Sequence, residues 1–96
     1  MVTGKTSTGF EFTVDTDKLM DDFELLDLMS QLQIETDSAR QSLLLIPIMK
    51  KMIGAKSFAQ LRKHCTENGI ISSQKMYSEM NEIYSYSGNN SSELKN

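Results

Sequence analysis

The sequence holds few of the residues from which catalytic and metal sites are commonly built. Its 96 residues include one cysteine, one histidine, one proline and no tryptophan. Cys65 alone cannot form an intramolecular disulfide, and together with His64 it supplies fewer than the three or four ligands of a zinc site. Phosphate-binding glycine loops, nucleophile elbows and carboxylates paired with a base are absent as well. We therefore expect no enzymatic activity, no metal and no cofactor, and we interpret Cys65 as a small core residue.

Membrane-spanning and secretory segments are also missing from the sequence. The most apolar run, residues 43–49, is far shorter than the roughly 20 residues that cross a bilayer. No basic-then-apolar leader opens the chain. Together with the single cysteine, these features predict an intracellular protein without a membrane partner.

The chain does contain a central apolar segment, residues 36–54, that is predicted to form a helix. Thr36, Asp37 or Ser38 can cap its start, and Gly54 can end it by adopting a positive φ. At about 100° per residue, one face carries Leu45, Ile48, Met49 and Met52, and the other carries Leu43, Leu44 and Pro47 among Arg40, Lys50 and Lys51. A helix that is apolar on nearly every side needs cover on more than one side, which indicates a partner.

Pro47 interrupts this helical pattern, because it lacks the N–H that would bond to the carbonyl of residue 43. The helix either kinks at this position or divides into two. In the second case Pro47 takes the first position of the second helix, where its missing donor costs nothing. Both conformations fit the sequence.

A second helix is predicted from Asp22 to Gln33, with acidic side chains at its start. Its apolar residues are Phe23, Leu25, Leu26, Leu28, Met29 and Leu32. They cover an arc of roughly 220°, about twice the width of one core-facing stripe. This helix therefore either lies between others in the interior or exposes part of its arc to a ligand.

The N-terminal segment is predicted to be an arm with one strand-like part. Residues 1–9 are small and polar, which is typical of a flexible arm. Residues 10–14 alternate between apolar and polar side chains, which is the period of a half-buried strand. A lone strand is not stable, so it needs another chain's edge, an unrecognised partner strand, or helices to lie across.

Two more helices are predicted after the central segment. Ser57 and Gln60 can form a capping box for a helix that runs to about Glu67 and is ended by residues 68–69. Ser72 or Ser73 can then cap a last helix over residues 74–85 with one clean apolar stripe.

These segments together predict an all-α fold of four to five short helices in an irregular bundle. The helical domain spans residues 15–85. It is preceded by the mobile N-terminal arm, residues 1–14, and followed by a disordered tail, residues 86–96, which has too little apolar surface to offset the entropy of ordering.

Charge is strongly segregated along the chain, although the total is only −3. Residues 1–37 carry nine acids and two lysines (−7), residues 38–64 carry six bases and no acid (+6), and the rest carries −2. The opposite segments attract each other, either inside one fold or between neighbouring copies in a head-to-tail contact that builds rings or spirals. The residues expected to support self-association are Phe10, Phe12, Val14, Lys50 and Lys51.

The order of segments along the chain carries a family resemblance. Residues 5–12, KTSTGFEF, are followed by an Asp-rich turn and by residues 22–28, DFELLDL. An apolar middle segment, a helix closing at residues 67–69 and a final helix with a polar tail come next. In this order, over most of its length, the chain resembles the small tail assembly chaperones (tape measure protein chaperones) of long-tailed siphophages of Gram-positive bacteria, lactococcal-type.

The resemblance implies a helical protein that coats the hydrophobic, helix-rich tape measure protein until tail tube subunits replace it. It implies three partners, which are tape measure helices, further copies of the protein itself and the tail tube protein. It places the protein in the host bacterial cytoplasm and outside the mature virion, and members of the family often have a longer product made by ribosomal frameshifting. The residues expected to bind tape measure helices are Phe23, Leu26, Met29, Leu43, Leu44, Pro47 and Met52.

A small DNA-binding regulator is the alternative function. In that case the basic segment, residues 40–63, contacts phosphates. The acidic total, the lack of a basic tail and the lack of a recognisable helix-turn-helix argue against it. Nucleic acid is therefore not the expected partner.

Overall fold

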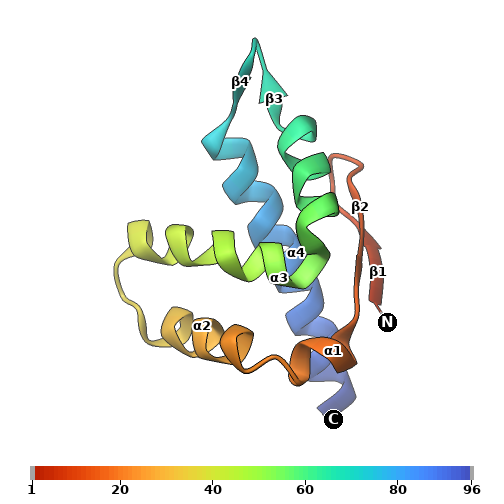
Figure 1. The fold of residues 1–96 in the computed structure, drawn as a ribbon, viewed down its shortest axis with the longest axis vertical. Coiled ribbons are helices and arrows are strands. Elements are labelled where there is room, and N and C mark those ends of the chain that lie inside the picture. The colour runs from red at the N-terminus through yellow and green to blue at the C-terminus, as the bar shows by residue number, and fades with distance from the viewer. Residues whose placement is uncertain (1, 96) are drawn as a thin grey trace.

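The computed structural model describes the chain from residue 2 to residue 95, with side chains from residue 2 to residue 86. Its elements are β1 (Val2–Lys5), β2 (Glu11–Val14), α1 (Thr16–Met20), α2 (Phe23–Ile34), α3 (Ser38–His64), β3 (Thr66–Glu67), β4 (Ile70–Ile71) and α4 (Ser73–Lys95). Helices dominate the fold, as predicted, and two short antiparallel strand pairs accompany them (Figure 1). Within the described residues, no helix is both long and apolar enough to span a membrane.

Helix α3 is the element against which the others pack, and it bends once. The side chain of Asp37 caps its start by accepting a hydrogen bond from the Ala39 N–H. The bend lies at Gly54, which has φ 86° and ψ 159°, a conformation that is essentially restricted to glycine. Pro47 lies inside the first half without breaking it. The predicted end at Gly54 is confirmed, and the division of the helix at Pro47 is not found.

The second half of α3 differs from the prediction at both of its ends. Its helix resumes directly after Gly54, so Ser57 lies inside it instead of capping its start. It ends at His64 rather than near Glu67. The capping box is therefore a wrong prediction, because the helix has already resumed before Ser57.

A tight hairpin replaces the predicted helix end at residues 66–71. Thr66 pairs with Ile71 and Glu67 with Ile70. The turn is made by Asn68 and Gly69, whose φ values of 54° and 79° are those that an Asn-Gly hairpin turn requires. Ser72 then caps α4 by accepting a hydrogen bond from the Lys75 N–H, as predicted.

The N-terminal segment is a β-hairpin and not an arm without a partner strand. Strand β1 pairs with β2 in a register that places Val2 opposite Val14 and Gly4 opposite Phe12. Gly4 is required here, since a Cβ at this position would lie 2.6 Å from the Phe12 ring. The partner strand was missed because its four residues, VTGK, are too polar and too short to show a strand period.

The core lies between α3, α4 and the N-terminal hairpin (Figure 1). Its buried side chains are Phe10, Phe12, Val14, Leu25, Leu45, Ile48, Met49, Met52, Ile53, Phe58, Leu61, Cys65, Met76, Met80 and Ile83. Helix α2 contributes only Leu25 to this set. It lies at the edge of the bundle, with α3 as its main neighbour.

The predicted tail, residues 86–96, lies mostly outside the residues whose side chains are described. The backbone of α4 continues through it to Lys95, beyond the predicted end near Ser85. The physical reason is that each added residue extends an existing helix by one hydrogen bond without the cost of a new nucleus.

Candidate partner-binding surface

Helix α2 has two opposite apolar faces, only one of which is covered. Its inner face carries Leu25, which is fully buried, and Leu28, Met29 and Leu32, which pack against the core. Its outer face exposes 80% of Phe23, 38% of Leu26 and 78% of Ile34. Of the two alternatives that the wide apolar arc leaves open, the structure contains the second, in which part of the arc faces solvent.

The first half of α3 also presents apolar side chains to solvent. Leu45, Ile48 and Met49 are buried in the core, whereas 58% of Leu43 is exposed and Leu44 and Pro47 are half-buried. Leu43 and Leu44 therefore lie on the surface as predicted. The apolar surface on α3 is adjacent in space to the C-terminal end of α2, because a short loop joins the two helices (Figure 1).

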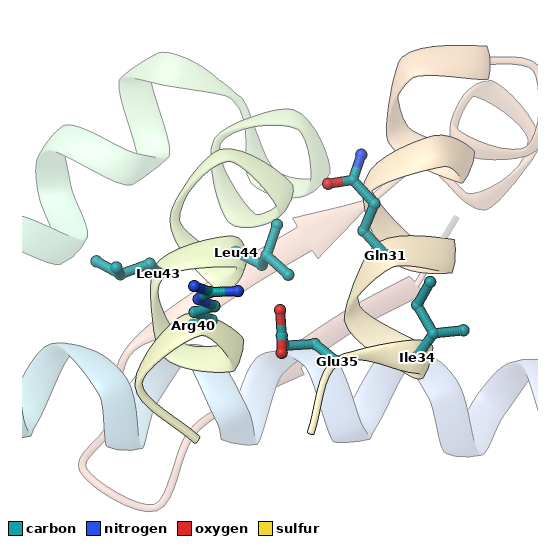
Figure 2. Close-up of a pocket in the computed structure, with 6 residues that line it drawn as sticks. All are labelled: Gln31, Ile34, Glu35, Arg40, Leu43 and Leu44. Atoms are coloured by element: carbon teal, nitrogen blue, oxygen red, sulfur yellow. The ribbon is translucent and has the colours of Figure 1, made fainter. Parts of the chain in front are cut away.

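A groove of ≈ 540 Å³ lies where these two helix ends meet, and we call it the α2–α3 groove. Its lining residues are Gln31, Ile34, Glu35, Arg40, Leu43 and Leu44. Figure 2 shows Gln31, Glu35 and Leu44 pointing into the space between the helices, with Leu43 and Ile34 on its outer sides. The groove thus has polar groups in its centre and two largely exposed aliphatic side chains at its edges.

The loop at one end of the groove is held by its own hydrogen bonds. The Glu35 carboxylate accepts from the backbone N–H groups of Thr36 and Asp37, at 3.1 and 3.2 Å. The side-chain amide of Gln41 donates to the Glu35 carbonyl at 2.6 Å. These bonds tie the end of α2 to the start of α3 and so set the width of the groove.

An ion pair holds the other end of α2. Lys51 lies 3.1 Å from Asp22 and 3.7 Å from Glu24. Asp22 caps α2 by accepting a hydrogen bond from the Leu25 N–H, and this bond lowers the pKa of the Asp22 carboxyl. The Lys51 ammonium lowers this pKa further. Asp22 in turn raises the pKa of Lys51. The acidic and basic segments therefore meet inside one protomer at this point.

Several predicted contact residues are not accessible at this surface. Met52 is only 6% exposed and belongs to the core, and Met29 faces inward. Both were assigned to partner binding because their type and spacing match the exposed residues, and only the packing separates them. Phe23 is exposed but lies at the opposite end of α2 from Ile34, about 16 Å away at 1.5 Å per residue.

The predicted self-association residues are corrected in the same way. Phe10, Phe12 and Val14 are at most 7% exposed, because β1 and the helices already cover them. Lys51 is paired with Asp22 in its own protomer. Lys50 alone of the five remains exposed, with its ammonium 5.5 Å from the centre of the Phe58 ring.

Ile34 was missed by the sequence analysis, because the predicted helix stops one residue before it. The signal was present, since Ile34 follows Phe23 by eleven residues and Leu26 by eight. These spacings place all three on one side of a helix at 100° per residue. Extending the helix by one residue would have included Ile34 in the outer face.

A second polar site lies where the N-terminal hairpin meets α4. The buried Glu79 carboxylate accepts hydrogen bonds from the hydroxyls of Thr6 and Thr8, at 2.8 and 2.9 Å. The Thr8 hydroxyl is also 2.9 Å from His64 Nε2. The Glu79 carboxylate and the Thr6 and Thr8 hydroxyls thus bond to one another, and these bonds fasten the hairpin to α4.

Cys65 and His64 make separate contacts within the fold. Cys65 is 1% exposed, and burial and then the Glu79 carboxylate raise the pKa of its thiol, which favours the protonated form. His64 instead contacts the Thr8 hydroxyl and the Phe10 ring. Within the described residues, no group of three or more His, Cys, Asp or Glu side chains could hold a metal ion.

Comparison with known proteins provides no relative from which a site could be transferred. No protein-family model, curated protein or solved structure shows significant similarity to the chain. The function is therefore argued from the exposed apolar surface and its surroundings.

Proposed function

We propose that the protein is a phage tail assembly chaperone that binds apolar helices of the tape measure protein through the α2–α3 groove. The observation that carries this proposal is the exposure of Ile34 and Leu43, at 78% and 58%, on either side of one groove. The resemblance in sequence supplies the identity of the partner. Contiguous exposed apolar surface rimmed by polar residues is a feature of protein-interaction sites.

The geometry of the groove suits a helix better than a small molecule. Two neighbouring helices form its walls, and an amphipathic helix can lie across them with apolar residues against Ile34 and Leu43 at the edges and polar residues toward Gln31 and Glu35 in the centre. Leu43, Leu44 and Ile34 are aliphatic and impose no hydrogen-bond geometry on what they contact. Such a surface can bind many different apolar stretches, which a coat for one long protein needs.

The size of the surface predicts weak binding by each copy. Full burial of an aliphatic side chain contributes about 1.5–3 kcal/mol, so Ile34 and Leu43 supply only a few kcal/mol. Association costs at least about 4 kcal/mol in lost translational and rotational freedom. A single protomer therefore binds a single helix weakly, and several copies on one long chain are needed for tight binding.

The DNA-binding alternative gains no support from the positions of the basic residues. Arg40 is paired with Asp37 at 3.8 Å and Lys51 with Asp22 at 3.1 Å. Lys50 lies over the Phe58 ring. Two of the six cations in the basic segment thus have a carboxylate partner within the protomer, and the alternative is kept as an outcome of the test below.

The experiment compares Leu43→Asp with Ile70→Asp. Both replace an exposed aliphatic side chain by a carboxylate, but Ile70, 70% exposed, lies on the β3–β4 hairpin outside the α2–α3 groove. Each variant is co-expressed with a tape measure helix fragment, and the soluble, co-purified fraction of the fragment is measured. We expect at least a tenfold loss of captured fragment for Leu43→Asp and little change for Ile70→Asp.

Circular dichroism on the purified variants controls for folding. If Leu43→Asp keeps its helix content and still captures as much fragment as the parent, the groove is not the binding surface and the proposal is wrong. DNA binding that falls steeply with salt would instead support the regulator.

A further inference from the structure

The first of two complementary surfaces lies where α1 meets α2, and we call it the acidic corner. Met20 and Phe23 are 70% and 80% exposed and are near neighbours in the chain. Asp17 and Asp21 are exposed beside them. Neither carboxylate has a side-chain partner among residues 2–86. The corner therefore combines two large apolar side chains with two unpaired negative charges.

The second surface is a groove of ≈ 410 Å³ between α3 and α4, which we call the α3–α4 groove. Its lining residues are Ile46, Lys50, Phe58, Arg62, Ile71, Ser73, Met76, Tyr77 and Met80. No carboxylate lines it. Within the described part of the chain, neither Lys50 nor Arg62 is paired with a carboxylate, in a protein that has thirteen acids. The groove therefore offers an apolar floor with two unpaired positive charges.

The two surfaces lie in different parts of one protomer. The acidic corner is next to α1, whereas the α3–α4 groove reaches Ile71 on the β3–β4 hairpin, at the far end of the longest axis (Figure 1). A contact between them can therefore be made only by two copies. Such a contact uses a different patch on each copy and leaves one corner and one groove free, so it can repeat.

We infer that the acidic corner of one copy docks into the α3–α4 groove of a second copy. Met20 and Phe23 would cover the apolar floor, and Asp17 and Asp21 would face Lys50 and Arg62. The apolar contacts supply most of the attraction, because exposed ion pairs contribute little each. The charges set the direction, since two acidic corners or two basic grooves repel each other.

This inference goes beyond the proposed function and uses neither Ile34 nor Leu43. It also identifies surface residues through which the acidic and basic segments of two copies would meet. The ion pair between Lys51 and Asp22 accounts for part of the opposite charge inside one protomer. Part of the unpaired remainder, namely Asp17, Asp21, Lys50 and Arg62, lies at the acidic corner and the α3–α4 groove.

The test uses two variants that each lose one surface. Met20→Ser with Phe23→Ser removes the apolar part of the corner, and Lys50→Glu with Arg62→Glu reverses the charge of the groove. All four side chains are exposed, so both variants should keep the parent's circular dichroism. Each variant alone should be monomeric by sedimentation velocity at low salt, whereas the parent forms larger species that shrink at roughly 0.5 M salt.

Mixing the two variants gives the decisive measurement. The corner variant retains an intact groove and the groove variant retains an intact corner, so an equimolar mixture should form a one-to-one dimer and nothing larger. A mixture that stays monomeric, a variant that assembles like the parent, or a parent that is monomeric at every salt concentration would each overturn the inference.

A second experiment exchanges the charges of the acidic corner and the α3–α4 groove. Asp17→Lys with Asp21→Lys should prevent assembly, and adding Lys50→Glu with Arg62→Glu to the same chain should restore it. Failure of this rescue would count against the assigned pairing. The Leu43→Asp variant tests the proposed function separately: it should assemble like the parent and lose only the tape measure fragment, because Leu43 lies outside the acidic corner and the α3–α4 groove.

Discussion

The two sides of helix α3 differ in how completely they are covered. On the side of α4 and the N-terminal hairpin, Ile48, Met80 and Ile83 are fully buried, and even the buried carboxylate of Glu79 has hydroxyl partners. On the side of α2, the covering helix buries one of its apolar faces and exposes the other. The comparison indicates that the α4 side supplies most of the buried core, whereas the α2 side leaves more apolar surface of its covering helix exposed to solvent.

The difference also predicts where the protein opens most easily. Helix α2 is held to α3 by its inner face, by the loop bonds at Glu35 and by the pair between Lys51 and Asp22. The opposite side combines a continuous core with a hairpin and a long helix. Segments with few buried contacts open at lower free energy than the core does, so we expect amide protons of α2 to exchange before those of α4.

The largest effect is expected from truncating α3 on its buried side. Ile48→Ala should lower the free energy of unfolding by about 2–5 kcal/mol, because Ile48 is fully buried and its removal leaves a cavity. Leu43→Ala, in the same half of the same helix, should change it by no more than about 0.5 kcal/mol, because Leu43 is already exposed. Urea denaturation followed by circular dichroism, at low protein concentration, measures both.

Equal losses from the two variants would break the comparison. That outcome would mean that Leu43 is covered in the isolated protein. It would remove the exposed edge of the α2–α3 groove and with it the reason for placing a partner there.

A smaller effect is expected from removing the carboxylate that fastens the hairpin. Glu79→Leu leaves the buried Thr6 hydroxyl without its acceptor, which should cost about 1–3 kcal/mol of unfolding free energy. Amide exchange at Phe10, whose N–H bonds to the Thr6 hydroxyl, should become faster. Hydrogen exchange read by NMR gives the residue-level result.

Glu82→Leu is the matched control for that variant. Glu82 also accepts hydrogen bonds from the hairpin, through the Ser7 N–H and hydroxyl, but these bonds are exposed to solvent. Its removal should therefore cost less than the removal of Glu79. The same cost for both variants would contradict the view that burial makes the Glu79 contacts important.

The smallest effect is expected at the ion pair on the α2 side and concerns pH. The folded-state pKa of Asp22 is lowered, so its stabilising contribution is present above the ordinary carboxyl pKa and is lost as pH falls through the lowered value. Asp22→Asn keeps an oxygen for the helix cap but removes the charge. The decrease in unfolding free energy on acidification should therefore be shallower in this variant.

The pH profile of the unfolding free energy also gives an internal check at its alkaline end. The pKa of Lys51 is raised in the folded protein, so its contribution is present below the ordinary lysine pKa and is lost as pH rises through the raised value. In Asp22→Asn, the decrease in unfolding free energy at alkaline pH should therefore also be shallower. Asp21→Asn, at a carboxylate with no side-chain partner among residues 2–86, should leave both ends of the profile as they are in the parent.

Part of the candidate site was predictable from the sequence and part was not. Leu43 and Leu44 were assigned to the surface because an apolar helix of this width has more apolar faces than a small domain can cover. Met29 and Met52 fit the same argument equally well, yet the structure buries Met52 and packs the half-buried Met29 against the core. Periodicity shows that a helix has surplus apolar faces, but it does not show which of them meets a neighbour.

The sequence by itself determined where several helices begin and end. The break at Gly54 was predicted and is found, and the observed caps Asp37 and Ser72 are each among the alternatives that were predicted. These features are local, because a cap contacts backbone groups within three residues and a glycine acts through its own φ.

Only the tertiary structure decided which apolar surface became core and which stayed exposed. Val2 pairs with Val14, and Thr6 donates to Glu79 across 73 residues of sequence. Neither strand β1 nor the buried carboxylate has a local pattern that predicts its partner. Burial depends on which distant segment arrives at a given face, and the hydrophobic effect that drives it has no direction of its own.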